Sequence, residues 1–155
     1  DDFDRGAARY ITFMNIMTNV VIDCSTFEPV DVKPAESQNP VAKGDLFFNG
    51  IFPVIDLGSG GSVRGYLTVM KETYAKIDDK TVLIPGHGEI ATKADLAKQI
   101  AMLEGAIAAV DKHVKRGDSL EKTLAARPLK PWEKYAWTFI PEKSFTTTLY
   151  NGLKK

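Results

Sequence analysis

The sequence predicts an α/β fold, on three observations. Short β-branched segments alternate with segments whose apolar residues recur every three to four positions, which is the pattern of strands and amphipathic helices. The 155 residues suit one compact domain and leave little room for two. The composition, 44% hydrophobic and 26% charged, is that of an ordinary globular protein. We therefore expect one compact, soluble domain in which strands and helices alternate.

The N-terminal segment, residues 1–40, is predicted to form a helix, a strand and a loop. Apolar residues recur at helical spacing over 2–17, which indicates an amphipathic helix. Residues 19–24 are short and β-branched, which favours a strand. Pro29, Pro34 and Pro40 punctuate the stretch 25–40, where we expect an extended loop or edge segment.

The rest of the chain, residues 41–155, continues this alternation. The expected elements are a strand over 41–48, a glycine-rich turn over 58–61, a helix over 63–77, a strand over 81–84, a long helix over 93–115, a short helix over 119–128 and a last helix over 144–153. One face of the first of these helices is expected to carry Tyr66, Leu67, Met70, Tyr74 and Ile77.

Helix boundaries in this region have recognisable capping residues. Ser62 is a predicted N-cap. Thr92 followed by Asp95 predicts an aspartate variant of the capping box at the start of the long helix. Gly117 is expected to end that helix.

The charge balance argues against two classes of partner. Lys plus Arg equal Asp plus Glu at 20 each, so the formal net charge is zero, which gives no overall attraction to nucleic acid or to an anionic membrane. No apolar run approaches the ~20 residues of a membrane span. The one cysteine, Cys24, cannot form an intrachain disulfide, so cysteine usage leaves the compartment unknown.

Two motifs place metal-ligand chemistry near predicted strand ends. Asp45 lies in Gly-Asp-Leu-Phe-Phe-Asn-Gly at 44–50, and His87 lies in Pro-Gly-His-Gly at 85–88. Ligand-binding groups collect at strand ends in open α/β sheets, and glycines beside His87 let the backbone turn sharply. A carboxylate and an imidazole are ligands that zinc, manganese or iron accept. Either motif alone also suits an ordinary turn.

Together with Ser-Gly-Gly-Ser at 59–62 and the helices that follow, these motifs closely resemble the hydrolase branch of the metallo-β-lactamase superfamily. The resemblance covers 41–155 and implies the C-terminal half of an αβ sandwich, a sheet with flanking helices. It implies that Asp45 bridges two metal ions and that His87 completes the shell of the second. The implied cofactor is zinc or another divalent transition metal. The implied activity is metal-dependent hydrolysis of a small-molecule substrate.

Most of that family's metal ligands have no counterpart in this chain. The family's N-terminal half carries His-x-His-x-Asp-His and a further histidine, whereas this sequence holds only His87 and His113. We expect His113, on the long helix, to be solvent-facing or partly packed. Asp23 and Cys24, at a predicted strand end, are alternative ligands, although a lone cysteine on an apolar strand is more often a small buried hydrophobe.

Other polar and aromatic groups have structural interpretations. Asp56 is expected to organise its loop, and Ser62 to cap a helix rather than to form an anion-binding nest with Ser59. An aromatic cluster near the C-terminus is expected to pin that tail to the core rather than to form a ligand platform; its members are Trp132, Tyr135 and Trp137.

Half of such a sandwich, on its own, would expose an apolar sheet face and an unpaired strand edge to water. Three arrangements remedy this: cover by residues 2–24, pairing of two copies with two-fold symmetry, or a longer protein that supplies the other half. We favour self-association as a homodimer.

Three functions remain open for such a half-domain. One is a metal-dependent hydrolase that is degenerate or incomplete as a single chain, because a catalytic zinc usually has three protein ligands. A second is a non-catalytic structural or interaction remnant. The third, a subunit that completes a composite metal site across an interface, lies between them.

Overall fold

The computed structural model describes residues 40–42, by their backbone, and residues 46–154. The helix expected over 2–17 and the strand expected over 19–24 lie outside these residues, as does nearly all of the loop over 25–40. Asp23, Cys24 and Asp45 lie outside them too.

The described residues combine helices with a small sheet, so the α/β class is confirmed at this level. In chain order the elements are β1 (Pro40–Ala42), α1 (Val63–Lys76), β2 (Val82–Ile84), β3 (Ala91–Thr92), α2 (Lys93–Lys115), α3 (Leu120–Ala126), the 3₁₀ helix η4 (Lys130–Tyr135) and α4 (Glu142–Lys154). β3 and η4 were not expected from the sequence. None of the described helices has both the length and the apolar composition that crossing a membrane requires.

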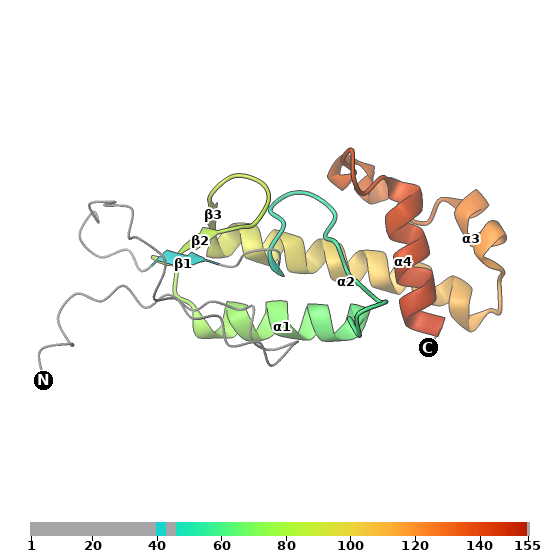
Figure 1. Ribbon diagram of the computed structural model, residues 1–155, viewed down its shortest axis with the longest axis horizontal. Helices are drawn as coiled ribbons and strands as arrows, with labels where there is room; N and C mark the ends of the chain where they lie inside the picture. The colour runs from blue at the N-terminus through green and yellow to red at the C-terminus, as the bar shows by residue number, and fades with distance from the viewer. Residues whose placement is uncertain (1–39, 43–45, 155) are drawn as a thin grey trace, which may run out of the picture.

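Among the described residues the strands form a three-stranded sheet in the order β1-β2-β3. β1 pairs in parallel with β2, with Val41 opposite Leu83, and β2 pairs antiparallel with β3. A parallel pair needs a crossover connection, which α1 supplies. The sheet lies at one end of the two long helices, α1 and α2, and α3 and α4 lie at the other end (Figure 1). We call these the sheet end and the helical end.

Local capping fixes where the two long helices begin. The Ser62 side chain accepts a hydrogen bond from the Gly65 backbone N–H at the start of α1. Thr92 and Asp95 form the predicted capping box at the start of α2, each side chain bonded to the other residue's backbone. Gly117 adopts a φ of 73° just beyond the end of α2, a left-handed conformation that glycine accepts readily. The predicted caps are therefore confirmed.

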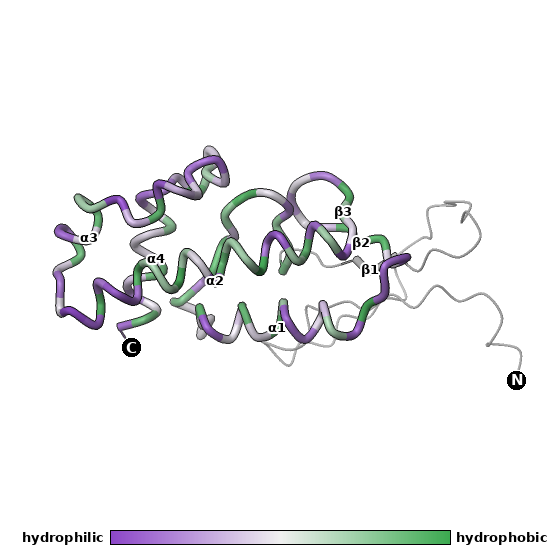
Figure 2. Tube along the Cα trace, turned by 180° about the vertical axis from the view of Figure 1, so that it is seen from behind, coloured by the Kyte–Doolittle hydropathy of each residue, from purple (hydrophilic) through white to green (hydrophobic). Residues whose placement is uncertain are grey.

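α2 is the central helix, because it packs against both α1 and α4, and apolar and polar residues alternate along it and along α1 (Figure 2). The predicted face of α1 is wrong in part, since Tyr74 is 38% exposed while Thr73 is buried. Thr73 donates its hydroxyl to the Val69 carbonyl at 2.9 Å, so its polar group is satisfied inside the core. Tyr74 instead lies beneath the Lys93 ammonium.

Candidate functional site

The fold brings the two sequence motifs side by side. Phe48 forms a parallel bridge with His87. The Gly86 amide donates to the Phe47 carbonyl at 3.1 Å, and the Asn49 amide donates to the His87 carbonyl at 2.9 Å. Residues 46–52, which we call the motif loop, therefore run along the segment that carries His87. The strand expected over 41–48 is confirmed only at β1 and at this bridge.

The backbone at His87 turns through a glycine, as predicted. Gly88 has a φ of 94°, and a Cβ placed there would meet the Asn49 carbonyl oxygen at 2.5 Å. Only glycine fits both the conformation and the close approach. His87 itself is exposed at this turn.

Two aromatic rings contact the His87 imidazole. The Phe48 ring stacks on it with centroids 4.9 Å apart and an interplanar angle of 9°. The Trp137 ring meets it at 5.4 Å and 45°, and also lies 6.3 Å from Phe48. Phe139 extends the cluster through a contact of 5.2 Å with Trp137.

The sequence analysis named Trp137 as a residue that pins the tail, but it missed the contact of Trp137 with His87. Trp132 and Tyr135 pack against the core, which is the pinning role expected of them. Trp137 also pins the tail, because its Nε1–H donates to the Phe52 carbonyl at 2.9 Å, but it reaches His87 as well. The chain around Trp137 carries no local pattern that links it to a histidine fifty positions earlier.

Buried side chains from both long helices hold the motif loop. The Tyr66 hydroxyl of α1 donates to the Leu46 carbonyl at 2.8 Å, and burial raises the pKa of that phenol, which keeps it a donor. Gln99 of α2 donates to the Ile51 carbonyl at 2.9 Å. The loop's backbone is thus anchored on the helical layer at two points besides the Trp137 bond.

The described residues do not by themselves fit a bound metal. Within residues 46–154, no group of three or more His, Cys, Asp or Glu side chains is placed to hold one. His87 is therefore the one predicted donor that the structure describes, and Asp45, Asp23 and Cys24 lie outside the described residues. A catalytic zinc needs more donors than this.

The loop before α1 has the structural role that the sequence suggested. Asp56 accepts hydrogen bonds from the Gly58 and Ser59 amides at 2.9 and 3.1 Å and from the Ser59 hydroxyl at 2.7 Å. These bonds lower the pKa of Asp56, and the bond from the Ser59 hydroxyl has the largest effect. Asp56 is thus a loop-organising carboxylate, and Ser62 is an N-cap.

A second cluster of charged groups lies at the helical end, around the buried Asp118. Its carboxylate accepts from Lys122 at 2.6 Å and Arg116 at 2.7 Å, and both contacts hold its pKa well below the ordinary value. His113 Nδ1 lies 3.0 Å away, so this histidine is partly packed, as expected. The Tyr150 hydroxyl of α4 donates to the Asp118 carbonyl at 2.6 Å. The cluster joins α2, α3 and α4.

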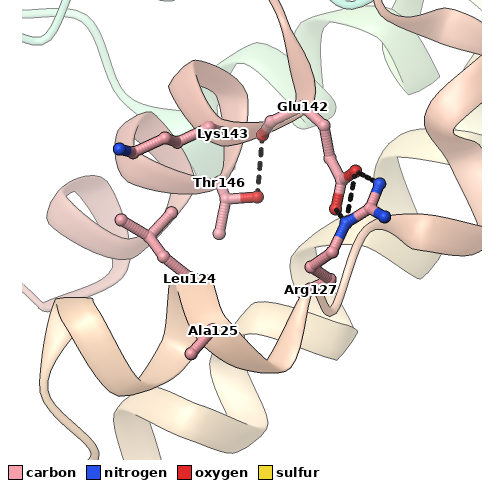
Figure 3. A pocket seen from close by; sticks show the side chains of 6 residues that line it. All are labelled: Leu124, Ala125, Arg127, Glu142, Lys143 and Thr146. Carbon is pink, nitrogen blue, oxygen red and sulfur yellow. Dashed lines mark hydrogen bonds and ion pairs between the residues drawn. The ribbon is translucent and has the colours of Figure 1, made fainter.

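A pocket lies between α3 and α4, also at the helical end (Figure 3). The side chains that line it are Leu124, Ala125, Arg127, Glu142, Lys143 and Thr146. The guanidinium of Arg127, which lines this pocket, is paired with the carboxylates of Glu142 and Glu133. The pocket contains no residue of either sequence motif.

Comparison of the sequence with models of known protein families finds no match, and comparison with curated proteins finds none either. The motifs and the geometry that joins them are therefore the basis for the function proposed below.

Proposed function

We propose that this chain is the C-terminal half of a metallo-β-lactamase-fold hydrolase and that it supplies part of a metal site through Asp45 and His87. One observation carries the proposal: the motif loop and the His87 turn, about forty positions apart, are bonded together along their backbones and through the Asn49 side chain. This pairing brings the residues that follow Asp45 in the sequence beside the His87 turn.

The metal would be zinc or another divalent transition metal, and its chemistry would be the activation of water for attack on an ester, amide or lactam-like bond. His87 would donate a ring nitrogen and Asp45 a carboxylate oxygen. Because the described residues supply too few donors, the remaining ligands would come from Asp23, Cys24 or a second chain.

Exposed apolar side chains around the His87 turn support a homodimer. Ile84 of β2 is 41% exposed, Ile90 next to β3 is 71% exposed, and Phe139 beside Trp137 is 77% exposed. Exposed apolar residues gathered near a candidate site are typical of surfaces that another chain covers. In a two-fold dimer the second copy would cover them and complete a composite site.

The alternative is a non-catalytic remnant that keeps the half-fold as a structural or interaction module. The observation that favours it is the shortage of clustered metal ligands within residues 46–154. Under this alternative Asp45 and His87 are turn residues.

Metal content separates the two proposals. The full chain would be purified without chelators and its bound metal measured by elemental mass spectrometry, beside Asp45→Ala and His87→Ala. His113→Gln is the matched control, because the sequence contains two histidines and this one belongs to the Asp118 cluster. We expect stoichiometric metal that both site variants lose and the control keeps. Metal-free protein, with stable site variants, would favour the remnant.

Oligomeric state tests the composite site. Sedimentation at micromolar concentration is expected to show a dimer, and metal content is expected to fall when Ile90→Ser disrupts it. A monomer that binds metal stoichiometrically would refute the composite site while keeping the hydrolase proposal.

A further inference from the structure

We propose that Trp137 is a positioning residue that sets the orientation of the His87 side chain. The inference rests on the proposed function only in taking His87 as a metal donor. The orientation of the ring itself is a property of the metal-free chain.

The backbone at His87 is fixed by the motif loop, and both of its sequence neighbours are glycines. The His87 carbonyl and the Gly86 amide are both bonded to the motif loop. Glycine stands on each side of His87, so neither sequence neighbour offers a side chain that restricts the imidazole. The rotamer must be selected by residues distant in the sequence.

Phe48 and Trp137 are placed to make that selection. Phe48 is 1% exposed and lies parallel to the imidazole, so it covers one face of that ring. Trp137 meets the same imidazole at 45°. Two rings at different inclinations restrict a third ring more strongly than one parallel partner does.

Trp137 can act in this way because its own ring is held at one end. Its Nε1–H bond to the Phe52 carbonyl is 2.9 Å long, and its backbone amide donates to the Ile140 carbonyl at 3.3 Å. The same indole thus touches the imidazole and is tied to the motif loop that pairs with the His87 turn. Displacing the indole would loosen both the imidazole and the motif loop.

A donor whose ring is already oriented loses less freedom when it binds a metal. Residues that orient metal-bound histidines typically change metal affinity by about 10–100-fold when removed. The chain offers a matched control in Trp132, its other tryptophan, which packs over Gly105 of α2.

The first test uses metal-free full-length protein and the three-bond Hα–Hβ couplings of His87 measured by nuclear magnetic resonance, assigned with His113→Gln. We expect couplings of a single rotamer in the parent and in Trp132→Phe. Trp137→Ala is expected to give averaged couplings, and Trp137→Phe, which keeps a ring, to restore most of the single-rotamer pattern. If Trp137→Ala does not fold, Trp137→Leu replaces it. Unaveraged couplings in whichever of these two variants folds would overturn the proposal.

The second test titrates Zn²⁺ against a chromophoric chelator. Trp137→Ala is expected to bind zinc about tenfold more weakly than the parent, and Trp132→Phe to bind it equally well. Equal affinity in the parent and in folded Trp137→Ala would overturn the positioning role. No zinc binding by any variant, together with averaged couplings in Trp137→Ala, would support the positioning of His87 and refute the metal site itself.

Discussion

The helical end and the motif loop pair their polar groups differently. At the helical end, charged side chains bond to one another: Asp118 accepts from Lys122 and Arg116, and Arg127 pairs with two glutamates. Along the motif loop, neutral side chains bond to backbone carbonyls, as Tyr66, Gln99 and Trp137 do. The helical end thus has satisfied ion pairs, and the motif loop has an anchored backbone.

The charged clusters and the pocket between α3 and α4 lie at the helical end, and neither contains a residue of the two sequence motifs. The lowered pKa of Asp118 has a structural cause, because the groups that lower it, Lys122 of α3 and Arg116 at the end of α2, join two helices. His87, in contrast, lies in a glycine turn against fixed aromatic rings. Structural ion pairs also shift pKa values, so the lowered pKa of Asp118 is not by itself a sign of function.

The largest expected effect compares a glycine from each end. Gly88 and Gly117 both have positive φ, but a Cβ would meet the Asn49 carbonyl oxygen only at Gly88, and the space at Gly117 is open. We expect Gly117→Ala to cost about 1 kcal/mol for the left-handed backbone and Gly88→Ala about 3 kcal/mol, because a steric clash is added. Urea unfolding of both variants measures this. Equal losses of stability in the two variants would mean that the motif loop moves away from the added methyl group without a cost in free energy.

A pair of buried tyrosines sharpens the comparison. Tyr66 donates to Leu46 in the motif loop, and Tyr150 donates to Asp118 at the helical end. Each phenylalanine variant is expected to lose about 1.5 kcal/mol, since a buried carbonyl loses its partner. Hydrogen exchange should then differ: only Tyr66→Phe is expected to speed exchange of the Asn49 and Gly86 amides. Faster exchange there in Tyr150→Phe would show that the two ends are not independent.

Alkaline pH should also act through Tyr66. Burial raises the pKa of Tyr66 well above its ordinary value of about 10, so its contribution to stability is complete below about pH 10 and is lost as pH rises beyond it. We expect this one group to lower the free energy of unfolding by about 1.4 kcal/mol for each pH unit above 10. Denaturant midpoints of the parent and Tyr66→Phe between pH 9 and about 11 provide the check. If the midpoints of the parent and of Tyr66→Phe change in parallel with pH, the prediction is wrong.

Acid should affect the capping box at the sheet end of α2. Hydrogen bonds from Lys98 and Thr92 lower the pKa of Asp95 to about 2 from 3.8. The contribution is therefore present above about pH 4 and is lost as pH falls toward 2. Asp95→Asn is expected to cost about 1 kcal/mol at neutral pH and almost nothing at the acid limit. If Asp95→Asn lowers the free energy of unfolding by the same amount at neutral and at acid pH, the effect comes from helix packing.

The smallest effect is expected at Arg127, a non-glycine residue with a φ of 46° at the end of α3. Arg127→Gly relieves a left-handed backbone worth about 1 kcal/mol but removes exposed ion pairs, which contribute little to stability in water. We expect the midpoint temperature of thermal unfolding to change by less than the experimental error. A large loss would show that the Glu142 and Glu133 pairs are far stronger than surface pairs usually are.

Local features of this fold could be predicted from the sequence. Ser62, Thr92 and Asp95 bond within one helical turn, so each cap depends on residues that stand together in the chain. Asp56 was identifiable for the same reason, because its partners are two and three positions away.

Long-range features could not be predicted in this way. Tyr74 and Thr73 differ in burial because of how α1 meets α2, which the helical period alone does not fix. Trp137 contacts His87 only because the tail folds back across the motif loop. The motif at His87 showed which side chain to examine, but its ring partners depend on the tertiary fold.

The pairing of the motif loop with the His87 turn also bears on the order of folding. Contacts within helices form between near neighbours, whereas the Asn49 side chain reaches Glu89 across forty positions, and all of α1 lies between them. Closing so long a segment costs chain entropy before any contact is gained. We therefore expect the helical layer to form first and the imidazole to reach its aromatic partners among the last steps. Substitutions at this junction would then speed unfolding and leave the folding rate nearly unchanged.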